Sequence, residues 1–219
     1  MKFDPDFVLS ALPALIEAAG LTVRLALAAT LLGIAGGTAL TVLRAMKWRV
    51  PNALIGMVMS LIIGTPLLIQ IFVFYYVLPA IGIDLGPLTA GILALALNSS
   101  VFVSEMMRGG LTTINPGEIE AAVALGLRAP AIWLRVVLPQ VLARIVPNLI
   151  GEFTIIVKAT ALLSVITVVE LFRTAQQIYS SNFRPFETLV AAALIYIVIN
   201  VVASTAGALV EHRLSVRRS

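Results

Sequence analysis

The sequence predicts an all-α integral membrane protein that forms one transmembrane domain over residues 1–219. Hydrophobic residues make up 60% of the chain, charged residues only 12%, and the mean hydropathy is +1.04. Soluble domains carry about 25% charged residues, so a soluble fold of this size would lack the polar side chains to cover its surface. Apolar runs near the roughly 18-residue length that crosses a bilayer recur along the chain. Together these features predict about five membrane-spanning helices.

The apolar runs are separated by segments too polar to cross a bilayer. The longest of these are residues 108–144 and residues 170–187, and we expect the second to form a loop outside the cell. No repeat of 20–50 residues is visible. The five predicted spans cover about 21–43, 54–77, 88–107, 145–169 and 189–209.

Prolines make the first two predicted spans irregular. The apolar patch at residues 7–20 is interrupted by Pro13 and Glu17, so we expect it to form a separate interfacial helix before the first span. The second span is broken near Gly64-Thr65-Pro66. Proline frees backbone carbonyls that need other partners, so this break predicts a kink that shapes either a translocation path or only the packing of the helices.

The basic residues fall unevenly on the two sides of the membrane. With five spans, ten Lys and Arg residues lie on one side and three on the other. The positive-inside rule places the larger set in the cytoplasm, so the N-terminus is expected outside and the C-terminus and the 108–144 loop inside. The larger set contains Arg44, Lys47, Arg49, Arg108, Arg128, Arg135, Arg144, Arg213, Arg217 and Arg218, and the smaller set contains Lys2, Arg173 and Arg184.

The residue inventory excludes several kinds of chemistry. The chain has no cysteine, which excludes disulfides and thiolate sites, and its single histidine, His212, lies near the C-terminus. The nearest glycine cluster, residues 33–38, lacks the lysine of a phosphate-binding loop, so the chain cannot hydrolyse ATP by that chemistry. The basic residues lie in short loops, where they set membrane orientation and do not indicate nucleic-acid binding. We therefore expect a protein that is not an enzyme and binds no cofactor or metal.

The loop at residues 108–144 predicts two short helices. Asn115 is placed to cap a first helix, with Glu118 three residues later as its capping-box partner. Gly126 is placed to end this helix in the left-handed conformation. A second helix is expected from Pro130, with Pro139 marking a boundary before the next span. Such a helix pair either docks in a groove of a partner protein or rests on the bilayer as an ordinary amphipathic loop.

This loop resembles the EAA loop of permease subunits of binding-protein-dependent ABC importers. In that family the loop is a coupling helix that docks into a groove of a partner ATPase dimer, and the ATPase binds ATP and Mg²⁺. Glu118 precedes the motif, and Val136 stands where isoleucine is commoner. The matching positions are Glu120, Ala121, Ala122, Gly126, Val136, Leu138 and Pro139.

The resemblance covers nearly the whole chain. Within the family, the chain is similar to the branch that transports polar amino acids. The resemblance implies the type I ABC importer permease fold in the bacterial inner membrane. It also implies a second permease subunit, identical or homologous, a periplasmic solute-binding protein, and an amino-acid substrate that is polar or charged. The chain departs from the branch pattern at Ile63, Ala159 and Ala161, which puts the substrate's polarity in doubt. The matching segments are residues 64–79, 104–111, 158–171 and 184–200.

Polar residues within the spans are the candidates for a substrate path. Lys158 would cost about 2.5–3.5 kcal/mol at the bilayer centre, so it lines the path, contacts another subunit or reaches an interface. Glu105 and Arg108, three apart on a helix, either pair or contact ligand. Glu170, on the outer side, either meets a periplasmic binding protein, closes an external gate, or is a capping or solvated carboxylate. The path candidates are Thr65, Pro66, Gln70, Asn98, Glu105, Lys158, Thr160 and Ser164.

Two other functional classes compete with the importer permease. A stand-alone, ion-coupled secondary amino-acid transporter would need intramembrane carboxylates, for which Glu152 together with Lys158 is a thin basis. A membrane-embedded enzyme would find few catalytic groups in this chain. The importer permease is the function that the sequence favours.

Overall fold

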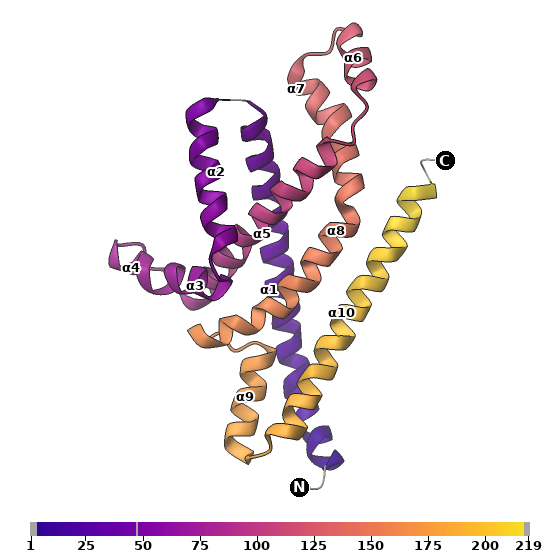
Figure 1. The fold of residues 1–219 in the computed structure, drawn as a ribbon. Coiled ribbons are helices and arrows are strands. Elements are labelled where there is room, and N and C mark those ends of the chain that lie inside the picture. Colours follow the sequence, from indigo (N-terminus) through magenta and orange to yellow (C-terminus); the bar gives the residue numbers. More distant parts are fainter. Residues whose placement is uncertain (1–3, 47, 217–219) are drawn as a thin grey trace.

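The computed structural model describes residues 4–46 and 48–216, and the side chains of residues 4–46 and 48–211. Every regular element in these ranges is a helix (Figure 1). The basic residues Lys2, Lys47, Arg217 and Arg218 lie outside the described residues. In chain order the elements are α1 (Pro5–Ala45), α2 (Arg49–Gly64), α3 (Leu67–Phe72), the π segment η1 (Val73–Val77), α4 (Leu78–Ala80), α5 (Pro87–Leu111), α6 (Pro116–Ala124), α7 (Ala129–Ile132), the π segment η2 (Trp133–Val137), α8 (Leu138–Ala159), the 3₁₀ segment η3 (Thr160–Ile166), α9 (Leu171–Asn182) and α10 (Pro185–Val216).

Four continuous helical stretches in the described part of the chain are long and apolar enough to cross a membrane. They are Pro5–Ala45, Pro87–Leu111, Ala129–Ile166 and Pro185–Glu211. A bent pair, Arg49–Gly64 with Leu67–Ala80, makes a fifth span if its two halves are counted together. The predicted all-α membrane fold of about five spans is confirmed.

The expected interfacial helix at residues 7–20 is not a separate element. α1 runs without a break through Pro13. The physical reason is packing, because one face of this segment, including Ala11, Leu15 and Ala19, is buried in a cluster with residues of α9 and α10. Tertiary contacts of this kind outweigh the local disruption by one proline. The helix that contains the first predicted span therefore begins at Pro5.

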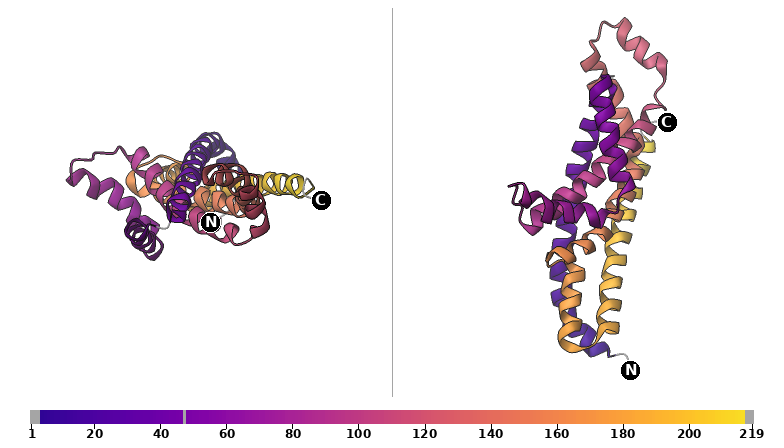
Figure 2. Two further views of the ribbon diagram at one scale, coloured as in Figure 1. Left: turned by 90° about the horizontal axis from the view of Figure 1, so that it is seen from above. Right: turned by 60° about the vertical axis from the view of Figure 1, so that its left-hand side comes forward.

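The second predicted span is broken where expected, but the break is far sharper than a kink. α2 ends at Gly64, α3 begins at Leu67, and the two halves meet at 112°. α3 and α4 consequently project to the side of the helix bundle (Figures 1 and 2). The predicted break at Gly64-Thr65-Pro66 is confirmed, and its angle makes the segment a bent pair of helices.

The fourth span begins earlier than predicted because Pro139 does not interrupt it. Helical structure continues from Ala129 through η2 into α8. Pro139 has no N–H to donate, and the chain adapts by widening one turn, so that the Leu138 N–H bonds to the Trp133 carbonyl five residues earlier. The span ends in η3 at Ile166, before the predicted end at residue 169.

The expected external loop at residues 170–187 contains a helix of 12 residues, α9. Its hydrophobic residues follow helical spacing, and Leu171 and Ala175 are buried against α1 and α10. α9 and the N-terminal end of α1 lie at one end of the molecule, and α6 and α7 lie at the opposite end (Figure 1). We call these the α9 end and the loop end.

α1 and α5 form the most extensive helix–helix contact among the described residues. A Cβ atom placed on Gly33 would lie 2.6 Å from the Ser99 Oγ atom, and one placed on Gly37 would lie 2.7 Å from the Ser100 carbonyl oxygen. These distances are too short for any side chain larger than hydrogen, so the glycines permit the close crossing. The crossing places α5 at the centre of the bundle, where it can carry contacts between the membrane part and the loop end.

Candidate functional site

The segment between α5 and α8 folds into two short helices that meet at a glycine. The Asn115 side-chain oxygen accepts a hydrogen bond from the Gly117 N–H at 3.0 Å and caps α6. After α6 the chain turns at Gly126, which has a φ of 76°. Glycine adopts this left-handed conformation without a side-chain penalty. The predicted elbow at Gly126 is confirmed.

α6 attaches to the rest of the protein through a small side chain. Ala122 is 4% exposed and is buried in a cluster with Ile132, Val137 and Val141. The Leu127 N–H donates to the Ala122 carbonyl at 3.1 Å, which closes the turn beneath α6. Because alanine is small, α6 lies close to the helix that follows it.

The opposite side of α6 and the elbow are open. Leu125 is 80% exposed and Val123 is 59% exposed, and both Glu120 and Ala121 are exposed. Exposed apolar side chains grouped at one place on a protein mark an interaction site. The geometry is therefore a rigid elbow that presents a small apolar surface, flanked by Glu120, away from the body of the protein.

Glu118 does not complete the predicted capping box. Its carboxylate accepts a hydrogen bond from the Gln140 side-chain amide, in the first turn of α8. The expected contact rested only on the three-residue spacing of Asn115 and Glu118. Because the helix after the elbow continues into α8, Gln140 lies beside α6 and takes the carboxylate instead. The bond ties α6 to α8, which begins with Leu138 and Pro139.

Thr65, Pro66, Gln70 and Asn98 come together at the break between α2 and α3. The Gln70 Nε2 atom donates to the Ile62 carbonyl at 2.8 Å and to the Thr65 carbonyl at 3.1 Å. The Asn98 Nδ2 atom, from α5, donates to the Gln70 Oε1 atom at 3.0 Å. Gln70 is 8% exposed. The cluster therefore stabilises the break and joins it to α5.

Glu105 lies at the loop end of α5 and pairs with two arginines. Its carboxylate is 2.7 Å from the Arg108 guanidinium, as the spacing on the helix predicts. It is also 3.1 Å from the Arg44 guanidinium of α1, a contact that joins residues 61 positions apart. Glu105 is therefore not part of the cluster at the break. Its ion pair with Arg44 links α5 to α1.

Lys158, Thr160 and Ser164 lie where α8 passes into η3. Thr160 is fully buried, and its hydroxyl donates to the Val157 carbonyl at 2.8 Å. Ser164 is 4% exposed. Lys158 is exposed and has no hydrogen bond or ion pair with any residue that the structure describes. An unpaired lysine at this depth requires water or another subunit beside it.

Glu170 is a helix cap and not a surface residue. Its carboxylate is fully buried and accepts hydrogen bonds from the Phe172 and Arg173 N–H groups at 3.0 and 2.8 Å, at the start of α9. It also accepts one from the Tyr196 hydroxyl at 2.8 Å. The proposed contact with an external protein does not fit this burial, whereas the capping alternative does.

Glu152, which the sequence offers only as a basis for ion coupling and not for the substrate path, is a buried carboxylate. It is 4% exposed and faces Ser99 of α5, whose side chain is completely buried. The signal was present, because a carboxylate within an apolar span is costly and normally has a function. Lys158 is six positions further along α8, and the two side chains lie on different faces of the helix, one buried and one exposed.

The described residues contain no group of three or more His, Asp or Glu side chains that could hold a metal ion. The path candidates other than Glu105 instead form two separate sets. One set surrounds the α2–α3 break and the neighbouring α5. The other lies at the end of α8, where Leu163 and Ile166 pack in the same hydrophobic core as Ile71 of α3.

The chain was compared with known protein families and curated proteins. A family model described as the binding-protein-dependent transport system inner membrane component matches residues 29–216. The glutamine transport system permease protein GlnP of Escherichia coli K12 is 34% identical over 222 residues, which cover 99% of this chain and 100% of GlnP. The nopaline transport system permease protein NocM of Agrobacterium fabrum is 34% identical over 211 residues, with 92% and 88% covered. The arginine transport system permease protein ArtQ of Bacillus subtilis is 29% identical, with 98% of each chain covered.

Solved structures give the same result for the fold. A crystal structure of an amino acid ABC transporter with histidines contains a chain that superposes with a TM-score of 0.86 at 32% identity, covering 97% of this chain and 100% of that chain. An inward-facing structure of the MetNI methionine ABC transporter superposes with a TM-score of 0.75 at 18% identity, covering 91% and 95%. The second similarity concerns the fold alone.

Proposed function

Because the chain belongs to the family of binding-protein-dependent transport system inner membrane components, we propose that it is the permease subunit of an ATP-driven importer of a polar or charged amino acid. It is a multi-pass protein of the inner membrane. The amino-acid substrate is supported by full-length similarity to permeases named for glutamine and arginine transport. No finding favours the alternative of a stand-alone, ion-coupled transporter.

The observation that carries the coupling mechanism is the open surface of α6. Leu125 and Val123 are apolar and exposed at the tip of the protein, where water would otherwise cover them. In the proposed complex this surface docks into a groove of a separate ATPase, in the helix-in-groove mode. Glu120 and Ala121 lie on the docking side, and Ala122 and Gly126 set its shape.

The motion that ATP binding and hydrolysis produce in the ATPase then passes to the membrane-spanning helices through α6 and α8. Two ATPase subunits bind ATP and Mg²⁺ and close. α6 moves with them and displaces α8, to which it is tied by the bond between Glu118 and Gln140. Leu138 and Pro139 lie in the first turn of α8, so motion of the elbow enters the span at these residues. This chain itself binds no cofactor in the proposed mechanism.

A second permease subunit, a copy or a relative, completes the path. The exposed, unpaired Lys158 supports this, because a charged side chain inside a membrane needs a polar neighbour. A periplasmic solute-binding protein delivers the substrate, and the spans alternate between outward and inward access. In this proposal Thr160, Ser164 and Glu152 lie near the path, whereas Thr65, Pro66, Gln70 and Asn98 hold the bend in its wall.

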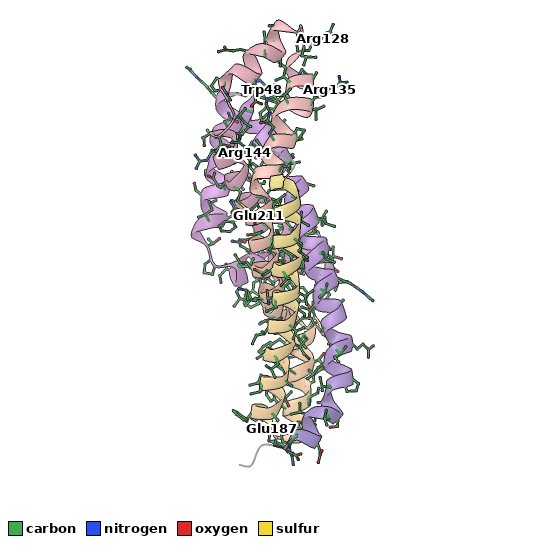
Figure 3. The ribbon with its side chains drawn as sticks, turned by 90° about the vertical axis from the view of Figure 1, so that its right-hand side faces the viewer. Trp48, Arg128, Arg135, Arg144, Glu187 and Glu211 are labelled. Atoms are coloured by element: carbon green, nitrogen blue, oxygen red, sulfur yellow. The ribbon has the colours of Figure 1, made fainter. Side chains whose placement is uncertain are left out.

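The orientation proposed for the chain follows its charges. Trp48, Arg128, Arg135 and Arg144 lie toward the loop end, and Glu187 lies at the α9 end (Figure 3). The positive-inside rule places the loop end in the cytoplasm. The N-terminal end of α1 and all of α9 then face the periplasm, and α10 carries the C-terminus to the cytoplasmic side.

Co-purification tests the proposed partner. The substitution Leu125→Glu places a charge in the docking surface, and we expect the ATPase to be lost from the purified complex. The control is Val50→Glu, since Val50 is similarly exposed, at 71%, near the start of α2 at the same end of the molecule. If the ATPase remains bound to the Leu125→Glu protein as firmly as to the parent, α6 is not the docking element.

A further inference from the structure

Two cavities meet at the loop end of α1 and share Ala45 as a common wall. The first, of about 250 Å³, lies between α1 and α5 and is lined by Thr41, Arg44, Ala45, Ser104, Arg108 and Leu111. We call it the arginine cavity. The second, of about 450 Å³, is lined almost entirely by apolar side chains, including Val42, Ala45, Met46, Trp133, Leu134 and Leu138. We call it the tryptophan groove.

The arginine cavity carries a positive charge that its own residues do not neutralise. One carboxylate, Glu105, lies between two guanidinium groups. Arg44 contacts it through Nη1, and Arg108 contacts it through Nε and Nη2. Two positive charges and one negative charge leave one net positive charge. The Arg108 side chain is 65% exposed, so part of its guanidinium remains free to bind an anion.

The floor of the arginine cavity is polar and rigid. The hydroxyls of Thr41 and Ser104 lie 3.1 Å apart, and Thr41 donates to the Gly37 carbonyl at 2.8 Å. Both side chains are at least nine-tenths buried, so they are held in place by the α1–α5 contact. The single hydrogen of each hydroxyl is used in these two bonds, so the donors left for a ligand are the guanidinium groups, whose forked N–H groups suit the oxygens of a phosphate.

We infer that these two cavities form a binding site for an anionic phospholipid of the cytoplasmic leaflet. The phosphodiester lies against Arg44 and Arg108, and the apolar part of the molecule lies in the tryptophan groove. Basic pockets between membrane helices on the cytoplasmic side are the sites where anionic headgroups bind. A free phosphate would use the arginines but would leave the adjoining apolar groove empty, so the pair of cavities favours a lipid.

The membrane depth of the site agrees with this ligand. Arg44 and Arg108 lie in the last turns of α1 and α5, which the proposed orientation places at the cytoplasmic surface of the membrane. Trp48 lies at the same end of the molecule (Figure 3), and tryptophan favours the level of the headgroups. The groove is also walled by Trp133 and Leu134, which connect directly to α7 and the elbow. A bound lipid would therefore contact both α1 and the segment that transmits motion from α6.

The test measures lipid retention by the intact complex, independently of transport. The complex is extracted with the subunits that co-purify, exposed to phosphatidylglycerol or phosphatidylcholine, and examined by native mass spectrometry. We expect retained phosphatidylglycerol and no retained phosphatidylcholine. Arg108→Gln should weaken the retention about fivefold, whereas Arg49→Gln, an exposed arginine of α2 at the same end, should leave it unchanged.

A second variant keeps both arginines. Ala45→Phe fills the shared wall and should lower phosphatidylglycerol retention even though every charge remains, which also covers the case in which Arg108→Gln unfolds. If Arg108→Gln and Arg49→Gln lower phosphatidylglycerol retention equally, the lipid is held by general electrostatic attraction, and the proposed site is overturned. Displacement of the lipid by an equal concentration of glycerol phosphate would overturn the lipid in favour of a free anion. Loss of the ATPase from Arg108→Gln with lipid retained would assign the cavity to the protein partner instead.

Discussion

At the residue scale, the side chain of Gln70 supplies the hydrogen bond that the backbone of Pro66 cannot donate. Pro66 has no N–H, so the carbonyl of Ile62, four residues earlier, loses its usual helical donor. The Gln70 Nε2 atom donates a hydrogen bond to that carbonyl at 2.8 Å. Asn98 of α5 then satisfies the Gln70 oxygen. The sharp bend is thus stabilised by two amides, and a bend in lipid is tolerated only with such partners.

Replacing Gln70 by leucine should therefore destabilise the protein, because it leaves the Ile62 carbonyl and the Asn98 amide without partners. The expected loss is about 1–3 kcal/mol for each group left buried and unsatisfied. Thermal unfolding of the solubilised complex measures it as a lowered Tm. Gln177→Leu is the matched control, because Gln177 of α9 is exposed. Equal Tm values for the two variants would contradict the role of Gln70.

Glu170 shows a second structural use of a polar residue. Its carboxylate caps α9 and joins that helix to Tyr196 of α10 and, at 3.4 Å, to the Thr22 hydroxyl of α1. Glu170→Ala should cost at least about 1 kcal/mol for the lost cap, and more for the partners left buried. Glu17→Ala, an exposed carboxylate of α1, is the control for Tm. Unchanged stability in Glu170→Ala would rule out the structural role.

Local spacing predicted some of these contacts and could not predict others. The pair of Glu105 and Arg108 follows from their positions three apart on one helix. The contact of Thr22 with Glu170 joins residues 148 positions apart, so no local pattern contains it. Glu152 was visible as a carboxylate in an apolar span, but its burial depends on the meeting of α8 with α5. Long-range packing decides what local sequence leaves open.

At the element scale, the two π segments share one sequence pattern. η1 is followed by Leu78-Pro79 and η2 by Leu138-Pro139. In each case the leucine N–H bonds five residues back, to Val73 in the first and Trp133 in the second. A widened turn before proline avoids the clash and the missing donor of an ordinary helical turn. In η2 this turn lies between the elbow and α8, so it sets how α6 is rotated relative to the span.

The substitution Pro139→Ala restores the missing N–H and should let the π turn relax to an α turn. α6 would then rotate relative to α8 by up to about 100°, the angle of one residue. We expect binding-protein-stimulated ATP hydrolysis to fall while Tm does not. Pro147→Ala in the same helix, where no π segment precedes the proline, should keep hydrolysis near the parent value. Full stimulation in Pro139→Ala would mean that the π turn is dispensable.

Gly126 allows a separate test of the elbow. An added Cβ would meet no atom within 4 Å, so Gly126→Ala changes only the cost of the left-handed backbone. That cost is about 1–2 kcal/mol, and the amides of residues 116–127 should exchange hydrogen about tenfold faster. Gly109→Ala, where an added Cβ also meets nothing, controls for the methyl group itself. Equal exchange in both variants would mean that the elbow is not held by its glycine.

The elements were predictable where periodicity and turn residues agreed. The spans at 88–107 and 189–209 lie within α5 and α10, and the caps at Asn115 and Gly126 are where they were expected. Two differences share one cause. Pro13 and Pro139 predict helix boundaries, but burial of the surrounding helix faces and a π turn carry the helices through them. Proline marks a boundary only where packing does not compensate for it.

At the scale of the whole molecule, the chain has the features of one part of a larger machine. The predicted type I ABC importer permease fold is confirmed by the similarity of the whole chain to solved importer chains. Its exposed elbow and its unpaired Lys158 are both surfaces that a single chain leaves incomplete. The transported amino acid is selected together with other chains of the complex. This sequence therefore indicates the class of transporter and not its particular substrate.

Energy dependence of uptake tests the central claim most directly. The purified complex, with its ATPase and partner permease, is reconstituted in vesicles and supplied from outside with the binding protein and labelled amino acids. We predict uptake only when ATP is enclosed in the vesicles, and none with a proton or sodium gradient alone. Uptake by this chain without its ATPase, driven by an ion gradient, would contradict the account.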